Sequence, residues 1–436
     1  MPETSLLILA DDLTGALDSG VQFAKKGIVV RVYPSPEAAA EAAGENAGEL
    51  AGTDIPCETV SVINTSTRRL KPEEAARVTA ACAAAFNRCA YFYKKTDSCL
   101  RGNIGAELEA LMKASGVKRL PFAPAYPALG RTTEGGVQYL DGKPVHETSM
   151  AQDPLNPVTE SYIPAVIGKQ SAIPVQVVPP GADPHQAQNE REILVFDCKT
   201  SGGLRAIAAL LKDQDLIKAA AGCAGFAEAL MEVLPLKAEH REEGTENALK
   251  GLPLLVVSGS VHPVSREQIR AALDSGIPGL AAEAEKLGRK GWGSSAEAAA
   301  LAEECAGFLR DRGVCVLGTA AALEGGKEAA CDGDAGTIAG ELGKLAAATA
   351  GKCGPLVTAV FGGDTLSGVM EAYEYSRIVP EKELFPGVVL AEAAGPGGRG
   401  LIITKAGSFG TKDLVPRIAE YCKNHENRGD ENHVRL

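Results

Sequence analysis

The run Gly362–Thr365, which reads Gly-Gly-Asp-Thr, has the composition of a phosphate-binding turn. It follows an apolar stretch, Leu356–Phe361, and precedes a helix-like stretch, Leu366–Tyr373. Glycines between a strand and a helix let the backbone approach a phosphate, and the helix offers it unpaired N–H groups. Asp364 could coordinate Mg²⁺ or accept a proton, and Thr365 could cap the helix. The run predicts a nucleotide-phosphate site, although Gly-Gly-Asp also occurs in ordinary loops.

A second turn of the same kind lies upstream, at Ser258–Ser260. It joins the apolar run Leu254–Val257 to a helix-like stretch, Val264–Ser275. A glycine flanked by hydroxyls is a plausible contact for phosphate or ribose, although Ser-Gly-Ser is also common in loops. After the last apolar run, Lys405 and Gly407 could close over the same nucleotide. These features support a nucleotide site in the C-terminal half.

Three other motif interpretations fail. Gly395–Gly400 formally matches the dinucleotide pattern Gly-x-Gly-x-x-Gly, but it precedes a strand and does not join a strand to a helix. The sequence contains no Gly-x-x-x-x-Gly-Lys-[Ser/Thr], which excludes a P-loop kinase at the level of motif. Ala10 stands where phosphatases of the Asp-x-Asp-x-Thr type have their nucleophile, so covalent aspartyl-phosphate chemistry is not expected.

Acidic, hydroxyl and cationic side chains lie at the ends of three apolar runs of the N-terminal half. They are Asp11 and Asp12 after Leu6–Ala10, Asn64–Arg69 after Val60–Ile63, and Lys94–Asn103 at the end of Tyr91–Lys94. Ligands of open parallel sheets bind outside the carboxyl ends of the strands, where these residues would lie. Arginines match a carboxylate bidentately, and acids accept protons from hydroxyls. The pattern predicts a site for a small, anionic, polyhydroxylated molecule. The structural alternatives are that Asp12 only caps the next helix and that the cations are surface charge.

The composition and the first residues of the chain indicate which class of ligand the protein binds and where in the cell it is located. The chain has 436 residues, 45% of them hydrophobic, and a formal net charge of −12. We expect two or three folded domains and a small-molecule ligand, because nucleic acids and anionic membranes call for a basic surface. The first residues have no basic segment, and Leu6–Ala10 is too short for a signal peptide, which predicts a cytoplasmic protein. The 11 cysteines form no Cys-x-x-Cys pair, so most should be reduced core residues.

The order of the predicted elements indicates an α/β fold. Short apolar runs alternate with alanine-rich helical stretches, which is typical of parallel sheets flanked by helices. The charged stretch 237–251 interrupts this alternation and is predicted to be a linker between domains at 1–236 and 252–436. The prolines of Pro121–Thr133 predict a rigid loop beyond the first residues of the stretch, which could build a site or serve only as a structural crossover.

Six motifs together resemble the four-carbon acid sugar kinases: Ala10–Asp18, Lys94–Gly105, Ala123–Thr133, Ser258–Ser260, Gly362–Thr365 and Thr404–Gly410. The resemblance spans nearly the whole chain in the right order. It implies two α/β domains, of which the first binds a sugar acid and the second binds ATP, with the active site in the cleft between them. It also implies transfer of phosphate from ATP, with Mg²⁺, to D-threonate or D-erythronate, giving the 4-phosphate.

The resemblance also assigns residues by motif. The substrate side is Asp11, Asp12, Arg68, Lys95, Thr96, Asp97, Ser98 and Arg101, and the ATP side is Ser258, Gly362, Gly363, Asp364, Thr365 and Gly407. Asp364 is the predicted ligand of Mg²⁺, and the carboxylates that could act in catalysis are Asp12, Asp97 and Asp364. The sequence does not select one of them as the base.

Two departures from the family pattern point to a shifted substrate preference: Asn64–Arg68 is a loose version of the usual run, and Cys99 stands where a hydroxyl residue is common. Lys94–Ser98 is closer to the threonate and erythronate kinases than to the 3-oxo-tetronate kinases. A kinase of 3-oxo-tetronate or a related sugar acid therefore stays an alternative, as does a non-catalytic sugar-acid sensor. Assembly into a homodimer also stays open.

Overall fold

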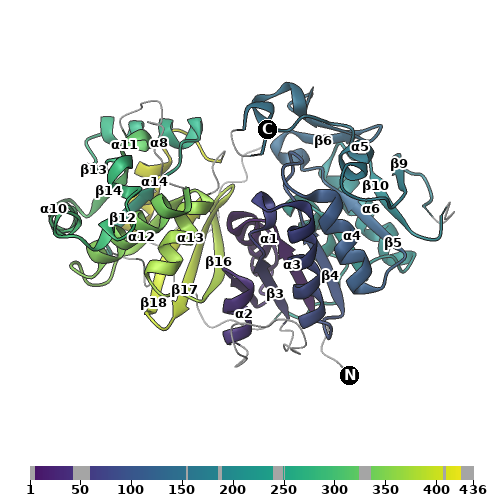
Figure 1. Cartoon of the computed structure of the whole chain (residues 1–436), viewed down its shortest axis with the longest axis horizontal. Coiled ribbons are helices and arrows are strands. Elements are labelled where there is room, and N and C mark those ends of the chain that lie inside the picture. The colour runs from purple at the N-terminus through teal and green to yellow at the C-terminus, as the bar shows by residue number, and fades with distance from the viewer. Residues whose placement is uncertain are drawn as a thin grey trace, which may run out of the picture. The chain divides into compact units, whose positions relative to one another are not determined.

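The computed structural model describes residues 5–42, 59–153, 156–184, 189–238, 249, 251–323, 335–405 and 409–423. The chain divides into two compact units, each an α/β structure (Figure 1). Unit 1 comprises Met1–His240 and Ser376–Lys382, and unit 2 comprises Arg241–Tyr375 and Glu383–Leu436. The predicted linker, 237–251, lies mostly outside the described residues.

Unit 1 is built on a parallel sheet with the strand order β2-β3-β1-β4-β11-β5-β10-β9. The strands are β1 (Leu6–Ala10), β2 (Val30–Tyr33), β3 (Val60–Asn64), β4 (Tyr91–Lys95), β5 (Arg119–Ala123), β9 (Val175–Val178), β10 (Glu192–Phe196) and β11 (Ala219–Gly222). At the β2 edge, Ile378 from the start of β16 (Arg377–Phe385) pairs antiparallel with Val32. The predicted parallel sheet is confirmed, and its central strand β1 is buried at every position, as expected for a strand covered on both faces.

The helices of unit 1 flank this sheet and follow its strands in the predicted alternation (Figure 1). They are α1 (Leu13–Ala24), α2 (Pro36–Ala42), α3 (Pro72–Ala85), α4 (Ile104–Ser115), α5 (Ile163–Gly168), α6 (Ser201–Asp213) and α7 (Ala224–Met231). Pro72 stands at the first position of α3, where a missing N–H costs nothing.

The predicted rigid loop within Pro121–Thr133 ends earlier than expected. The first residues of this stretch belong to β5, as predicted, but from Arg131 the chain enters β6 (Arg131–Glu134), which forms a small antiparallel sheet with β7 (Val137–Leu140) and β8 (Lys143–Pro144). The turn between β6 and β7 is held by Asp197, whose carboxylate accepts N–H groups from Gly135 at 2.7 Å and Gly136 at 2.9 Å. The carboxylate of Asp197, which is distant in sequence, thus stabilises a hairpin that the local sequence does not predict.

Unit 2 is built on mainly parallel strands in the order β13-β14-β12-β15-β18-β17. Its strands are β12 (Leu254–Ser258), β13 (Gly279–Ala282), β14 (Val314–Thr319), β15 (Val357–Phe361), β17 (Val388–Gly395) and β18 (Gly398–Lys405). Only β17 and β18 form an antiparallel pair among these, and Gly395 pairs with Gly398 at their turn. The glycine pattern in this region therefore lies on a hairpin, in agreement with its rejection as a dinucleotide site.

The described helices of unit 2 lie on its strands (Figure 1). They are α8 (Pro263–Asp274), α9 (Ala284–Leu287), α10 (Ala296–Arg312), α11 (Ala320–Leu323), α12 (Ala335–Ala350), α13 (Gly363–Ala372) and α14 (Leu414–Lys423). Each unit has an apolar core of its own: Leu7 and Phe122 belong to that of unit 1, and Val256 and Ile403 belong to that of unit 2.

Helices α12 and α13 approach each other at their backbones. A Cβ atom added to Gly343 would overlap the carbonyl of Gly368, and one added to Gly368 would overlap the carbonyl of Ala339. Both overlaps involve backbone atoms, which cannot rotate away as a side chain can. Two glycines therefore set the position of α13, the helix that follows the predicted phosphate turn.

We expect the Gly343→Ala substitution to lower the free energy of unfolding by about 2 kcal/mol or more, because overpacking forces the two helices apart. The matched control is Gly340→Ala on the same helix, where an added Cβ meets nothing within 4 Å. That change should be neutral or stabilise by about 0.5–1 kcal/mol, because alanine favours the helix. Urea unfolding of both variants measures the difference, and equal stabilities would refute the close packing.

Eight cysteines of the described part are free, and all except Cys353 are buried, as expected for small core residues. Cys89 is an exception to the expectation of reduced cysteines, because it is disulfide-bonded. None of the described helices combines the length and the apolar character needed to cross a membrane.

Candidate active site

Three neighbouring strands of unit 1 end at one edge of its sheet. Ala10 pairs with Asn64 of β3 on one side and with Lys95 of β4 on the other, so the three strands end in register. The segments that follow must therefore meet, although Arg68 lies 57 positions after Asp11 and Asp97 lies a further 29 positions along the sequence. This register places Asp11, the Arg68 turn and the Asp97 loop together.

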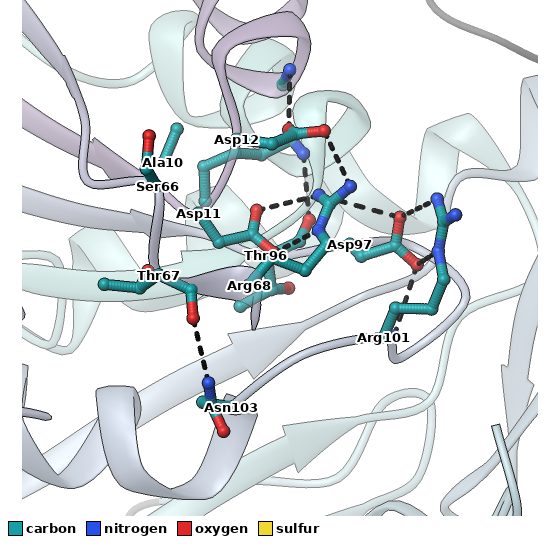
Figure 2. A network of polar contacts seen from close by, with 12 residues as sticks. Ala10, Asp11, Asp12, Ser66, Thr67, Arg68, Thr96, Asp97, Arg101 and Asn103 are labelled. Atoms are coloured by element: carbon teal, nitrogen blue, oxygen red, sulfur yellow. Dashed lines mark hydrogen bonds and ion pairs between the residues drawn. The ribbon is translucent and has the colours of Figure 1, made fainter. Parts of the chain in front are cut away.

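Arg68 lies at the centre of the resulting network (Figure 2). Its Nε and Nη2 donate to the two oxygens of Asp11 at 2.8 and 2.9 Å, and its Nη1 donates to Asp12 at 2.6 Å. A third carboxylate, that of Asp97, lies 3.8 Å from Nη2. The guanidinium fork thus joins acids from two different strand ends.

Asp97 is itself tied to Arg101 in the same loop (Figure 2). Nε and Nη2 of Arg101 donate to its oxygens at 3.1 and 2.7 Å, and the backbone N–H of Cys99 donates at 3.0 Å. The remaining nitrogen of Arg101, Nη1, donates to Asp153 at 3.0 Å. Asp153 is a residue that the sequence analysis missed, because no motif surrounds it.

The electrostatic environment keeps these carboxylates charged. Burial alone would raise the pKa of Asp97, but Arg101 and Arg68 outweigh it and hold that pKa well below the usual range. For Asp12, burial likewise raises the pKa, and the positive charges of Arg68 and Lys95 lower it further than burial raises it. Both acids are therefore ionised at neutral pH.

Asp12 has a second role as the N-cap of α1. Its Oδ1 accepts the backbone N–H of Gly15 at 2.8 Å, and its Oδ2 accepts the hydroxyl of Thr14 at 3.1 Å. The structural alternative from the sequence, a capping residue, is thus true, and it coexists with the contact to Arg68. The Asp12 side chain keeps 25% of its surface exposed, so a ligand can reach it.

The other predicted residues of the substrate side lie around this network. Lys95 donates to the carbonyl of Thr96 at 2.9 Å, and its Nζ lies beside the N-terminus of α1, since a Cβ on Gly15 would be 2.9 Å from it. The hydroxyl of Thr96 donates to the Gly222 carbonyl at 3.4 Å, toward β11. The carbonyl of Ser98 accepts the side-chain amide of Gln138 at 2.7 Å.

A buried ion pair between Lys94 and Glu107 stabilises the turn that carries Arg68. Lys94 is fully buried and its Nζ lies 3.0 Å from Glu107 of α4. Glu107 also accepts the hydroxyl of Thr67, the residue before Arg68, and Asn103 donates to the Thr67 carbonyl at 2.9 Å (Figure 2). Lys94 thus contacts Glu107 on one face of the sheet and Lys95 points to the other face, because successive residues of a strand point to opposite faces.

In unit 2, the two predicted phosphate turns lie next to each other. Ser258 pairs with Phe361 across β12 and β15, so the turns at Ser258–Ser260 and Gly362–Thr365 leave the same edge of the sheet. The N–H of Gly259 donates to the Thr365 hydroxyl at 3.2 Å. Gly362 has a φ of 102°, which side chains disfavour, and a Cβ there would lie 3.4 Å from Ser260.

Two polar groups at this edge bear on the predicted nucleotide site. Asp364 is exposed in the first turn of α13, and the hydroxyl oxygen of Ser258 is fully buried with no hydrogen-bond partner. Among the described residues there is no group of three or more His, Cys, Asp or Glu that could hold a metal ion by itself. A single carboxylate still fits Mg²⁺, which takes most of its ligands from nucleotide phosphates and water. Gly407, also predicted here, lies outside the described residues.

Lys405, at the end of β18, lies beside these turns. Its Nζ donates to the hydroxyl of Ser265 in the first turn of α8 at 2.7 Å and lies 5.1 Å from the centre of the Phe361 ring. Burial lowers the pKa of Lys405 to about 7. The lysine is therefore close to half-protonated at neutral pH.

The contribution of Lys405 to the stability of the protein should rise with pH between about 7 and 10. In that window the unfolded chain still protonates Lys405 while the folded chain does not, so the unfolded state binds more protons. The expected slope is up to about 1.4 kcal/mol per pH unit. Denaturant midpoints at pH 7 and pH 9 measure it, and Lys405→Met should flatten the difference. An equal rise in the variant would contradict this assignment.

Comparison with known proteins agrees with the prediction of a sugar-binding N-terminal half and a nucleotide-binding C-terminal half. Residues 6–230 match the model of a sugar-binding N-terminal domain, and residues 255–415 match that of a nucleotide-binding C-terminal domain. A D-threonate kinase of Bordetella bronchiseptica is 31% identical over 427 residues, which cover 95% of this chain and 96% of that protein. A D-erythronate kinase of Heliobacterium modesticaldum is 32% identical over 284 residues, or 62% of this chain and 60% of that protein.

A solved structure has the same fold. A Salmonella typhimurium LT2 protein described as a tRNA synthase superposes with a TM-score of 0.73 at 20% identity, covering 95% of this chain and 98% of the other. At this identity the likeness concerns the fold alone.

Proposed function

This chain belongs to the four-carbon acid sugar kinases, and from that premise we propose that it phosphorylates D-threonate or D-erythronate at the 4-hydroxyl, using ATP and Mg²⁺. The observation that carries the proposal is the charged network at the ends of β1, β3 and β4, in a unit that matches a sugar-binding domain. The names of the relatives support the four-carbon acids as the class of substrate.

The network suits a small sugar acid in both charge and reach. A tetronate has one carboxylate and several hydroxyls, which need cations and acids respectively. Arg101 has 27% of its side chain exposed and Asp12 has 25%, whereas Asp11 has only 2%. We assign the first two residues to ligand contact and Asp11 to holding Arg68.

Of the two acids on this side, Asp12 is the better base for the acceptor hydroxyl. The oxygens of Asp97 accept N–H groups from Arg101 and Cys99, and its side chain is only 10% exposed. The pKa of each acid is lowered by the neighbouring cations, but that of Asp97 is lowered more, which makes Asp97 the weaker proton acceptor. Asp97 therefore orients Arg101, and Asp12 receives the proton. Phosphoryl transfer depends mostly on such positioning and on charge neutralisation.

On the nucleotide side, the glycine turns and the N-terminus of α13 would supply N–H donors for phosphate oxygens, and Asp364 would hold Mg²⁺. When bound, the ion neutralises charge on the transferred phosphate. Lys405, next to Phe361, adds a positive charge to the same edge once it is protonated.

Replacing Asp364 by Asn should lower kcat by about two orders of magnitude and raise the Mg²⁺ concentration needed for half-maximal activity, because one ligand loses its charge. The fold should persist, since Asp364 is exposed. The matched control is Glu371→Gln, an exposed acid on the same helix, which should change neither quantity. An unchanged Mg²⁺ requirement in the Asp364 variant would remove it as a metal ligand.

The test of the function is ADP release by the purified chain with ATP and Mg²⁺ across D- and L-threonate, D- and L-erythronate and 3-oxo-tetronates. We expect ADP with D-threonate or D-erythronate, and phosphorus NMR of the product should show a phosphate ester at the 4-position. ADP with a 3-oxo-tetronate alone would reassign the substrate. Binding of a sugar acid without transfer would instead favour a sensor.

A further inference from the structure

The contacts of Arg101 divide into a fixed half and an exchangeable half. Nε and Nη2 are engaged by Asp97, which the N–H of Cys99 also fixes at 3.0 Å. Nη1 is engaged by Asp153 at 3.0 Å, from a segment 52 positions further along the chain. Asp153 keeps 20% of its side chain exposed, twice the 10% of Asp97. One face of Arg101 is therefore held within its own loop, and the other by an accessible carboxylate.

The formal charges of the network do not favour an anionic ligand. Four carboxylates face four cations: Asp11, Asp12, Asp97 and Asp153 against Arg68, Arg101, Lys95 and Arg131, which lies beside Cys99. A sugar acid adds a negative charge to a set whose charges are already balanced. Withdrawal of one internal carboxylate as the ligand arrives restores the balance.

Asp153 contacts neither Arg68 nor the N-terminus of α1, so its withdrawal leaves the contacts of Asp11 and Asp12 in place. Asp11 and Asp12 bridge to Arg68, and Asp12 also caps α1. Asp153 contacts Arg101 with Oδ2, while its Oδ1 accepts the backbone N–H of Asn156 at 2.8 Å. Its interaction with Arg101 can end while its own backbone contact remains.

We propose that Asp153 is an internal substitute for the carboxylate of the substrate and sets the affinity for the sugar acid by competing with it for Nη1 of Arg101. Without ligand, Asp153 satisfies the guanidinium. With ligand, the carboxylate of the sugar acid takes its place, and the wild-type affinity is reduced by the strength of the contact it replaces. The inference rests on the proposed function, because it concerns the acid group of that substrate.

The test is calorimetric binding of D-threonate and D-erythronate to the full-length Asp153→Asn variant without nucleotide. Asparagine keeps the shape and an oxygen for the Asn156 N–H but loses the charge that competes for Arg101. We expect Kd for the sugar acid to fall about tenfold, and Asp153→Ala to change it in the same direction. In the kinase assay, KM for the acid should fall while KM for ATP and kcat stay within about twofold.

Two controls isolate the effect. Glu160→Gln removes a charge from the same segment, where Glu160 accepts the N–H groups of Ser161 and Tyr162 at 2.8 Å, and it should leave Kd unchanged. Erythritol, the neutral four-carbon polyol, should bind the wild type and the Asp153 variant equally, because it has no carboxylate to compete.

An unchanged or weaker affinity of the Asp153→Asn variant for the sugar acid would overturn the proposal and make Asp153 a support or a direct ligand contact. The same holds if erythritol gains as much affinity as the acid. Failure of the wild type and both variants to bind any tetronate would overturn the proposed function as well. Tetronate binding with no gain from the substitution would overturn this inference alone.

Discussion

The substitution Arg68→Met should abolish measurable turnover and lower the free energy of unfolding by about 3–5 kcal/mol, the cost of leaving buried acids without their partner. Arg68 bridges Asp11 and Asp12 at 2.6–2.9 Å, and Asp11 is 2% exposed. Without the guanidinium, Asp11, Asp12 and Asp97 repel one another, and the ion pairs that join the segments after β1, β3 and β4 are lost. Denaturant unfolding and the ADP assay measure the two losses separately.

The pH dependence of this loss follows from the pKa values. Because the pKa values of Asp12 and Asp97 are lowered in the folded protein, their contribution to stability is present above the unfolded pKa of about 3.9. It is lost as pH falls through the lower folded values, as the acids become protonated. The difference between wild type and Arg68→Met should therefore shrink as pH falls below about 4.

The matched control for Arg68 is its exposed neighbour Arg69, and Arg69→Met should leave stability within about 0.5 kcal/mol of wild type. Arg68→Lys should be intermediate, because an ammonium cannot engage two carboxylates as the planar fork does. Wild-type stability and turnover in Arg68→Met would show that the network is not essential.

The substitution Asp12→Asn should lower kcat by about a thousandfold and should cost far less stability than Arg68→Met. Asparagine caps helices as well as aspartate, so the contact to the Gly15 N–H that begins α1 persists. Arg68 keeps its bidentate contact with Asp11. What the variant loses is the charged oxygen that accepts the proton of the substrate hydroxyl, an effect of about 10²–10⁴. Steady-state kinetics with the preferred acid measure it.

The Asp12→Ala variant separates the two roles of this residue. It should lose the same activity and in addition about 1 kcal/mol of stability, because the cap of α1 is gone. If Asp12→Asn instead raises KM for the sugar acid and leaves kcat intact, Asp12 binds the substrate and does not act as the base.

The local sequence carried most of the information on secondary structure. Fully buried strands such as β1 and β15 appear as short apolar runs, because a strand covered on both faces has no polar positions. One exception was the β6–β7 hairpin, predicted in part as a loop, because its turn depends on Asp197, more than sixty residues away. The position of α13 likewise depends on contact between Gly343 and Gly368, which no local pattern indicates.

The sequence alone determined the α/β class, the kinase family and the identity of the residues at the strand ends, because each is encoded in short segments with their own periodicity or motif. Tertiary structure alone decided how those residues are paired. The sheet places β1 between β3 and β4, so Arg68 meets Asp11 and Asp12, while strand alternation directs Lys94 toward Glu107. Arginines that the sequence assigned to the substrate carboxylate are engaged by acids of the chain itself, Asp153 among them. Such pairings depend on contacts distant in sequence, which local propensity does not specify.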